Sequence, residues 1–390
     1  MKSKLEQLIA ELCPDGVEYK TIGEIATDIF RGSGITRDQV TDDGIPCVRY
    51  GEIYTTYDIW FDKCISHTNE GQIANKKYFE YGDILFAITG ESVEEIAKSC
   101  AYVGCEKCLA GGDIVVLKHK EDPKYLAYAL STTDAQIQKS KGKVKSKVVH
   151  SSVPAIKEIK LPVPPLEVQR EIVRVLDNFT LLTAELTAEL TARRKQYEYY
   201  RNQLLGFMEG VQYKRLGDTC DMKAGKAISS ILISDYETAD SPIKCYGGNG
   251  IRGYVKEANQ HGEYPLIGRQ GALCGNVNYA TGSFYATEHA VIVKSKGMYY
   301  HRFLYHLLTH MNLNQYKSAG AQPGLAVKNL QELKAPVPPL EVQERIVRVL
   351  DNFESICSDF SVGIPAEIAA RQKQYEYYRD KLLTFKELNA

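Results

Sequence analysis

An internal repeat is the feature of this sequence that most constrains its fold. The segment "PVPPLEVQREIVRVLDNF" at residues 162–179 returns almost unchanged as "PVPPLEVQERIVRVLDNF" at residues 336–353. Further along, "RRKQYEYYRNQLL" at 193–205 returns as "RQKQYEYYRDKLL" at 371–383. Chance does not produce such identity twice in the same order, so the chain is predicted to contain two copies of one structural unit.

Fainter similarity upstream of each repeat divides the chain further. "GVEYKTIGEI" at 16–25 parallels "GVQYKRLGDT" at 210–219, and "GGDIVVLKH" at 111–119 parallels "TEHAVIVKS" at 287–295. Each half is therefore expected to hold a globular module that precedes one copy of the repeated segment. The expected boundaries are an N-terminal helix at 1–15, a first module at 16–161, a first connecting helix at 162–209, a second module at 210–334 and a second connecting helix at 335–390.

The repeated segments are predicted to be long helices. In the first, apolar residues follow the alternating four-and-three spacing of a coiled-coil face, and a helix from 166 to 205 would be about 60 Å long. The second contains Gly363 and Pro365, so it is expected to break near 363–365. Packed antiparallel, with the N-terminal helix completing their far end, the two helices predict a mixed α/β (α+β) fold. Two globular modules would be separated by the helical pair, and the whole would have a pseudo-two-fold internal repeat.

Composition narrows the class of protein. With 390 residues, 44% hydrophobic and 25% charged, the chain reads as a folded protein without a membrane partner, since no apolar run approaches about 18 residues. The start "MKSKLEQLIAELCPDG" lacks a signal peptide's apolar stretch, which favours the cytoplasm. Ten cysteines are expected as reduced thiols. The cluster of Cys100, Cys105 and Cys108 has no second pair of ligands nearby, so free thiols are favoured over a metal.

The motifs "PVPPLEVQ", "IVRVLDNF" and "KQYEYYR", each occurring twice behind a divergent module, closely resemble the specificity (S, HsdS) subunit of type I restriction-modification systems. The resemblance implies two target-recognition domains, each reading one half of a bipartite, non-palindromic site in double-stranded DNA. It further implies that the helices space these domains and dock two methyltransferase (M) subunits. Motor-nuclease (R) subunits would complete the restriction complex.

In the first module, candidate DNA-binding residues lie in two kinds of stretch. "FRGSG" and "CVRYGE" place Arg31, Arg49 and Tyr50 in polar or glycine-flanked segments, from which a loop can carry arginine to a guanine edge. "KSKGKVKSK" at 139–147 has five lysines and no acid, which suits contact with phosphates. The alternatives are arginines in surface salt bridges and a solvated lysine loop. The five lysines are Lys139, Lys141, Lys143, Lys145 and Lys147.

In the second module the candidates lie among glycines, in "IKCYGGNGIRGY" and "PLIGRQGALCGNV". Asn249, Arg252, Arg269 and Gln270 have side chains that can make bidentate contacts with bases, and the glycines permit close backbone approach. "LIGRQGALCGN" also resembles a stretch common in target-recognition domains, which favours Arg269. The matching stretch in the first module, "LFAITGESVEE", has no arginine, so the two modules are expected to read DNA with different residues.

Some repeated helix residues are candidates for docking the methyltransferase subunits, although packing within the helical pair is the safer interpretation for any single tyrosine. The candidates are Arg174, Tyr199, Arg201, Arg348, Tyr377 and Arg379.

No catalytic motif is found. The Pro-Pro pairs lack the flanking residues of an adenine methyltransferase motif, and a phosphate-binding GxxxxGK[ST] loop is absent, so a non-catalytic subunit without cofactor or metal is expected. Two alternatives stay open: a symmetric scaffold whose modules bind proteins or glycans, and a DNA-binding protein that needs no enzyme partner.

Overall fold

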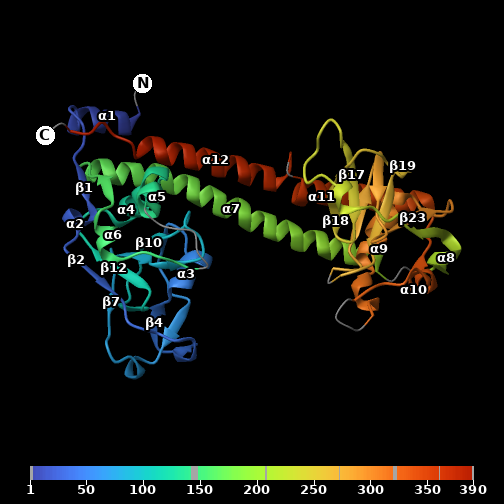
Figure 1. Ribbon diagram of the computed structural model, residues 1–390, viewed down its shortest axis with the longest axis horizontal. Helices are drawn as coiled ribbons and strands as arrows, with labels where there is room; N and C mark the ends of the chain where they lie inside the picture. The colour runs from blue at the N-terminus through green and yellow to red at the C-terminus, as the bar shows by residue number, and fades with distance from the viewer. Residues whose placement is uncertain are drawn as a thin grey trace. The chain divides into compact units, whose positions relative to one another are not determined.

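The computed structural model describes residues 3–141, 148–206, 209–271, 273–318, 323–359 and 361–388. The chain divides into two compact units. The first comprises Met1–Glu185 and Ile368–Ala390, and the second comprises Leu186–Glu367. Each unit contains one globular module together with helical segments (Figure 1).

Module 1 is built on two sheets, each with five strands among the described residues. The first has the order β2 (Asp28–Arg31), β12 (Ile114–Lys118), β8 (Ile84–Ala87), β10 (Ser99–Tyr102), β5 (Trp60–Phe61). The second has the order β3 (Val40–Thr41), β6 (Ser66–Thr68), β4 (Ile45–Val48), β11 (Cys108–Ala110), β7 (Tyr78–Phe79). The continuous apolar runs "ILFA" and "IVVL" form the central strands β8 and β12 because both of their faces are buried.

Module 2 repeats this topology with four strands in each sheet, as far as the described residues show. The first sheet has the order β16 (Cys220–Ala224), β23 (Ala290–Ser295), β20 (Tyr264–Gly268), β21 (Val277–Ala280). The second has the order β18 (Gly250–Val255), β17 (Ile243–Gly247), β22 (Ser283–Ala286), β19 (Gln260–His261). In both modules a parallel pair occupies the second sheet, β4 with β11 and β17 with β22. The repeat inferred from sequence is therefore a repeat of topology.

Short elements complete both modules. Two-stranded ladders join each module to its helix, β1 (Tyr19–Thr21) with β14 (Lys160–Pro162), and β15 (Tyr213–Arg215) with β24 (Lys334–Pro336). A further ladder pairs β9 (Thr89–Gly90) with β13 (Val149–His150). The short helices are α2 (Ile22–Ile25), α3 (Tyr50–Thr55), α6 (Val153–Lys157), α8 (Leu216–Thr219), α10 (Val327–Glu332) and the 3-10 turns Arg37–Gln39, Glu70–Gln72, Ser230–Leu232 and Leu313–Tyr316.

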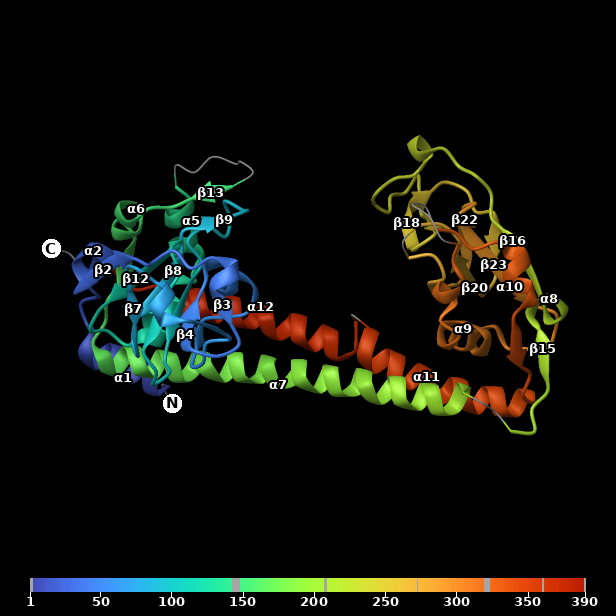
Figure 2. The ribbon, with the colours of Figure 1, turned by 90° about the horizontal axis from the view of Figure 1, so that it is seen from below.

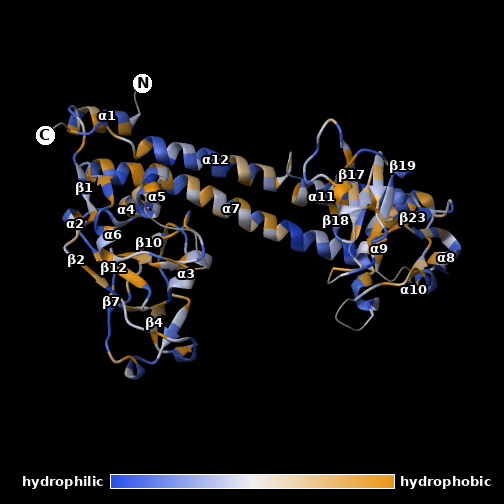
Figure 3. Cartoon of the chain, in the orientation of Figure 1, coloured by the Kyte–Doolittle hydropathy of each residue, from blue (hydrophilic) through white to orange (hydrophobic). Residues whose placement is uncertain are grey.

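One helix of each module is packed between the sheets and the long helices. In module 1 this is α4 (Pro123–Leu130), followed by α5 (Thr133–Ser140), and in module 2 it is α9 (His301–His310). The residues of α4 from Tyr125 to Leu130 are all buried, as expected for a helix that is covered on every side. Figure 3 shows apolar residues gathered in the sheets, whereas the C-terminal part of the first long helix is mostly hydrophilic.

The first long helix, α7 (Leu166–Leu205), runs for 40 residues without interruption. The second is divided: α11 (Leu340–Ser358) ends before α12 (Ile364–Leu382) begins, with Pro365 in the first turn of α12, where its missing N–H costs nothing. In the first unit, Phe179 of α7 stacks on Tyr378 of α12 at 5.5 Å. In the second unit, Tyr200 of α7 stacks on Phe353 of α11 at 5.4 Å. The two ends of α7 thus use equivalent aromatic pairs.

The N-terminal helix α1 (Lys4–Leu12) belongs to the first unit. It lies beside the N-terminal end of α7 (Figures 1 and 2). Its buried Leu5 shares a core with Val168 and Ile172 of α7 and with Leu383. Val17 donates its N–H to the carbonyl of Lys386 at 2.8 Å, which places the chain just after α1 beside the last residues of the second connecting segment. Among the described residues, no helix combines the length and the apolar character needed to cross a membrane. The ten cysteines are unpaired.

Candidate nucleic-acid interface

Backbone hydrogen bonds define equivalent positions in the two modules. Gly111 donates its N–H to the carbonyl of Val48 at 2.8 Å, and Thr287 donates to that of Tyr246 at 2.9 Å. These bonds extend the parallel pairs β4–β11 and β17–β22, so Val48 of module 1 corresponds to Tyr246 of module 2. The residues that follow, Tyr50 and Gly51 in one module, therefore match Gly248 and Asn249 in the other.

A second pair of bonds extends the match. Ile88 donates its N–H to the carbonyl of Asp113, and Arg269 donates to that of His289, at 3.0 and 2.9 Å. Asp113 thus matches His289, as the aligned stretches "GGDIVV" and "TEHAVI" indicate. Both modules have a surface pocket at these shared positions. The duplicated fold therefore has a concave surface at equivalent positions of its two copies.

The pocket of module 1 has a volume of about 460 Å³ and is rich in arginine. It brings together all three non-lysine candidates of this module, which lie far apart in the sequence. Its lining residues are Arg31, Gly34, Ile35, Arg37, Arg49, Tyr50, Gly51, Gly111, Gly112 and Asp113. Arg37 is the member that sequence reasoning missed, because "GITRDQV" offers no local sign that it faces the pocket.

The arginines of this pocket differ in how their guanidinium groups are held. Arg31 donates its Nε–H to the carbonyl of Gly112, and its Nη2 lies 2.5 Å from Asp113 Oδ1. Two of its three guanidinium nitrogens therefore already have partners. Arg49 lies with its Nε 3.5 Å from Oε1 of Glu52, a side chain that is almost fully buried. The pocket therefore combines a satisfied arginine with one whose outer nitrogens point to no acceptor among the described residues.

The pocket of module 2 has a volume of about 750 Å³ and is lined by amides and histidine in place of arginine. Asn249 accepts a hydrogen bond from Asn276 Nδ2 at 2.9 Å, which fixes its amide. Gln270 is exposed, and its backbone bridges to Gly324. The lining residues are Gly248, Asn249, Gln270, Gly271, Leu273, His289, Pro323 and Gly324.

The other two candidates of module 2 do not line this pocket. Arg252 is exposed on β18. Arg269 is half-buried, and its Nε has no hydrogen-bond partner in the described part of the chain. The structure thus brings Asn249 and Gln270 together in one pocket and leaves the two arginines outside its lining.

The lysine strip predicted at 139–147 is corrected at its first member. Lys139 is 5% exposed, and its Nζ donates to the carbonyl of Leu130 at 2.8 Å and to Ser99 Oγ at 3.3 Å. It lies in the last turn of α5, on the face that packs into module 1, so it does not reach a phosphate here. Lys141 is exposed at the end of α5. Lys143, Lys145 and Lys147 lie outside the described residues.

Replacing Lys139 with methionine should stabilise module 1. Burial lowers the pKa of Lys139 to about 7, whereas in the unfolded chain it is about 10.4. Between these values the unfolded chain binds one more proton, so the native protein gains stability as the pH rises from 7 towards 10. We expect Lys139→Met to add about 2 kcal/mol near pH 7, after the two lost hydrogen bonds are counted, and less by pH 10.

The gain from Lys139→Met can be measured by hydrogen exchange of module 1 across this pH range, with exposed Lys141→Met as the control. If the stability of module 1 had the same pH dependence in Lys139→Met as in the wild-type protein, the pKa of Lys139 would not be lowered by burial.

Sequence reasoning also missed a buried glutamine at the start of each long helix. Gln169 donates to the carbonyl of Pro164 at 2.8 Å and to Glu121 Oε2 at 2.7 Å, and it accepts from the N–H of Asp122 at 3.0 Å. Gln343 donates to the carbonyls of Pro338 and Met298, at 2.8 and 2.9 Å, and accepts from the N–H of Tyr300 at 3.0 Å. Each amide therefore ties the start of its long helix to the segment that leads into α4 or α9.

An acidic residue about two turns further along each helix makes a second tie. Asp177 accepts from Lys124 Nζ and from the Tyr128 hydroxyl, both at 2.7 Å. Its counterpart Asp351 accepts from Arg302 Nε at 2.7 Å and lies 2.6 Å from His306 Nε2. Both acids belong to the repeated "VLDNF". These contacts, with those of the glutamines, explain part of the repeated sequence by packing within each unit.

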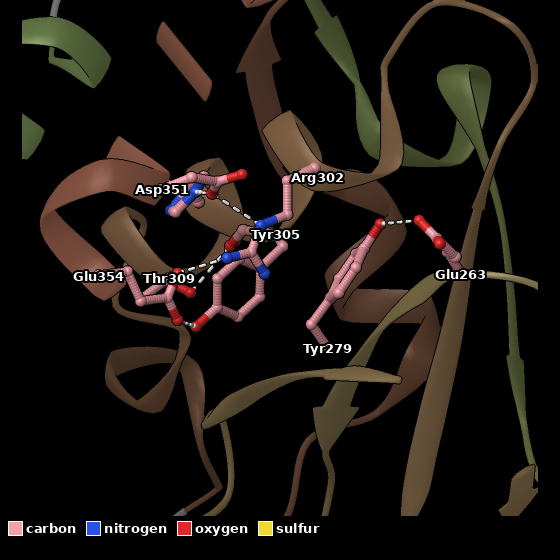
Figure 4. Close-up of polar contacts among 8 residues, drawn as sticks. Glu263, Tyr279, Arg302, Tyr305, Thr309, Asp351 and Glu354 are labelled. Carbon is pink, nitrogen blue, oxygen red and sulfur yellow. Dashed lines mark hydrogen bonds and ion pairs between the residues drawn. The ribbon is translucent and has the colours of Figure 1, made fainter. Parts of the chain in front are cut away.

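The second of these junctions contains the group in the described chain that most resembles a metal site (Figure 4). Ligand atoms of His306, Asp351 and Glu354 lie within 4.8 Å of one another. Arg302, however, bonds to Asp351 and also to Glu354 Oε2 at 2.6 Å, so its guanidinium already occupies an oxygen of each carboxylate. Burial lowers the pKa of His306, which keeps its ring neutral. The residues fit an ion-paired joint and do not fit a cation site.

The predicted partner-binding residues fall into equivalent pairs on the long helices. Tyr199 and Tyr377 are each 60% exposed, and each meets the ring of the following tyrosine edge-on. Arg174 and Arg348 are exposed and pair with glutamates of their own helix.

The last pair of predicted docking residues is turned inward. Arg201 lies over the ring of Tyr197 at 5.4 Å, and Arg379 over that of Tyr375 at 5.7 Å. The side chain of Arg379 is largely buried and contacts Asp380. Tyr199 and Tyr377 are therefore better exposed for a partner than these arginines, and they provide equivalent surfaces on the two long helices.

Comparisons with known proteins follow the same division of the chain. The model of the type I restriction modification DNA specificity domain matches residues 14–193 and 208–370. The EcoprrI specificity subunit of Escherichia coli is 53% identical over 207 residues, 51% of this chain and 52% of that protein. The EcoR124I/EcoR124II specificity subunit of Escherichia coli is 34% identical over 290 residues, 67% of this chain and 70% of that protein. The match thus spans about half the length of the first relative.

Solved structures show the same fold. The type I restriction-modification S subunit from M. genitalium aligns with a TM-score of 0.58 over 94% of this chain and 96% of that one, at 17% identity. The mixed α/β class with two modules and long connecting helices, predicted from the repeat, is confirmed.

Proposed function

Because this chain belongs to the type I restriction-modification DNA specificity family, we propose that it is the subunit that selects the DNA site of a type I complex. Each module would read one half of a bipartite, non-palindromic duplex sequence. The observation that carries this proposal is the pair of pockets at matching positions, one lined by arginines and the other by amides. Two pockets on the same backbone framework but with different lining residues suit two different half-sites. Identical lining residues would suit a palindromic site.

The same proposal assigns no catalytic step to this chain. Chemistry would come from two methyltransferase subunits, docked at the equivalent helix surfaces around Tyr199 and Tyr377, and motor-nuclease subunits would join the full complex. Repetition of one exposed tyrosine pair on both long helices supports two copies of one partner, because identical partners need identical surfaces. Divergent pockets and repeated helices then serve different molecules.

The proposal predicts a split recognition motif. The full chain, purified with a type I methyltransferase subunit from the same genome, is incubated with a pool of randomised duplexes, and the bound fraction is sequenced. We expect two short specified blocks around a fixed unspecified gap, and affinity that falls steeply as salt rises. Binding without sequence preference or salt dependence would support the protein- or glycan-binding scaffold. A motif selected by the chain alone, with no methyltransferase retained, would support the stand-alone DNA-binding protein.

A further inference from the structure

We propose that Arg49 reads a guanine in the half-site of module 1 and that Glu52 is the residue that positions it. The inference rests on the proposed DNA-recognition function and adds a base and a residue to it. Arginine is the side chain that most often recognises guanine, through paired bonds to O6 and N7 in the major groove.

The contacts around Arg49 hold one edge of its guanidinium and leave the other available. Its Nε faces Glu52 Oε1 at 3.5 Å, and its backbone N–H donates to Glu52 Oε2 at 3.2 Å. Neither Nη1 nor Nη2 has a hydrogen-bond partner among the described residues. An arginine that is fixed at Nε presents these outer nitrogens as a ready fork, so less conformational entropy is lost when a base is bound.

Glu52 is itself held firmly. It is 6% exposed, and its Oε1 accepts a hydrogen bond from Ser66 Oγ at 2.8 Å. It lies in the first turn of α3, beside the fully buried Ile53, so the helix cannot shift without opening the core of module 1. A buried carboxylate aimed at a partly exposed arginine is costly unless the arginine stays in place. Glu52 therefore restricts where Arg49 can point.

The neighbouring arginines are less suited to reading a base. Arg31 already contacts the carbonyl of Gly112 and the carboxylate of Asp113. Arg37 begins a 3-10 turn and is exposed, with no acid of the described chain to orient it. Of the three, Arg49 alone combines a buried positioning contact with a free fork in the described structure.

Two carboxylates lie beside the arginines of this pocket. Asp113 lines the same pocket with about a third of its side chain exposed, and Glu52 lies behind Arg49. They offset part of the positive charge of the three arginines, which weakens the attraction for a phosphate without removing it. A guanine presents only acceptors to Arg49, and the amino group of its paired cytosine is a donor that a carboxylate such as Asp113 can tolerate.

The assignment is specific to one module. The position in module 2 that corresponds to Arg49 is Gly247, one residue after Tyr246 in the matched strand. Its pocket offers the amides of Asn249 and Gln270, which are suited to adenine. A change at Arg49 should therefore alter one block of the motif and leave the other as an internal control for folding.

The test starts from the motif that the wild-type complex selects from randomised duplexes. If no motif emerges, the proposed function fails and Arg49 is not at issue. With a motif in hand, Arg49→Ala should abolish the preference for guanine at one position of one block and weaken binding to the wild-type site by about 10- to 100-fold. Glu52→Gln should weaken the same preference in part. Lys20→Ala, which removes an exposed charge on β1 outside the pocket, should leave the motif unchanged.

Two results would overturn the inference. A uniform loss of affinity for all sequences, with a shallower salt dependence and rescue by Arg49→Lys, would make Arg49 a phosphate contact. An unchanged motif for Arg49→Ala would show that Arg49 does not meet DNA.

Discussion

Replacing Gln343 with leucine should lower the free energy of unfolding of module 2 by about 3 kcal/mol. Gln343 is 0% exposed and satisfies three backbone groups, the carbonyls of Pro338 and Met298 and the N–H of Tyr300. Leucine has similar volume but no polar atoms, so these groups would lose their partners while they stay in a poorly hydrated junction. The same change at Gln169 should act on module 1 and leave module 2 unaffected, because the two junctions belong to different compact units.

Native-state hydrogen exchange, resolved by peptide, separates the two modules within the full chain, where one unfolding transition would not. Gln203→Leu is the matched control, since Gln203 is exposed on α7 in the same compact unit as Gln343. Its effect should stay within about 0.5 kcal/mol. If Gln343→Leu behaved like this control, the glutamine would be repeated for another reason, such as contact with a partner.

Gln169 and Gln343 show what could be predicted from the sequence and what could not. The repeat predicted two modules and two helices, and sequence identity over "PVPPLEVQ" showed that these positions are restricted. The resemblance to the specificity subunits implies that the repeated helices dock two methyltransferase subunits, which would also require identical residues. The structure shows that the glutamine and the aspartate of "VLDNF" serve contacts inside each unit, which a single sequence cannot distinguish from contacts with another molecule.

Site residues were harder to predict because their exposure depends on tertiary packing. Lys139 and Lys141 look alike in "KSKGK", but α5 turns the first into the core and leaves the second in solvent. Arg31 and Arg49 lie 18 positions apart, and only the sheet pairing brings them to one pocket. Glu52 is three residues from Arg49, a spacing that places both on one face of a helix start. That spacing is the signal in the sequence that points to Glu52.

The break in the second connecting segment resolves a difference in length. From Phe353 to Arg371 the chain has four residues more than from Phe179 to Arg193. Because α11 ends at Ser358 and α12 begins at Ile364, the break between the two helices can take up this excess. The aromatic stacks of Phe179 on Tyr378 and of Phe353 on Tyr200 are accordingly alike, at 5.5 and 5.4 Å.

Inserting a third "TAEL" after Leu190 of α7 should change the DNA sequence that the protein recognises. The two existing copies, at 183–186 and 187–190, lie in an unbroken helix whose middle has no buried residue, so four more residues should extend it at little cost in stability. We expect binding to the wild-type motif to fall by about 100-fold or more, since both half-sites can no longer be engaged together. Selection from randomised duplexes should return the same two blocks with a longer gap.

The size of the new gap follows from helix geometry. Four residues add about 6 Å and a net rotation of about 40°. The length is close to two base-pair rises of about 3.4 Å, whereas the rotation is close to the roughly 35° twist of one base pair. A gap longer by one would show that rotation of the modules controls the fit, and a gap longer by two would show that distance does. Thr191→Ala, which changes the same exposed stretch without changing its length, should keep the original gap. If the insertion left the gap unchanged, α7 would not be the element that spaces the half-sites.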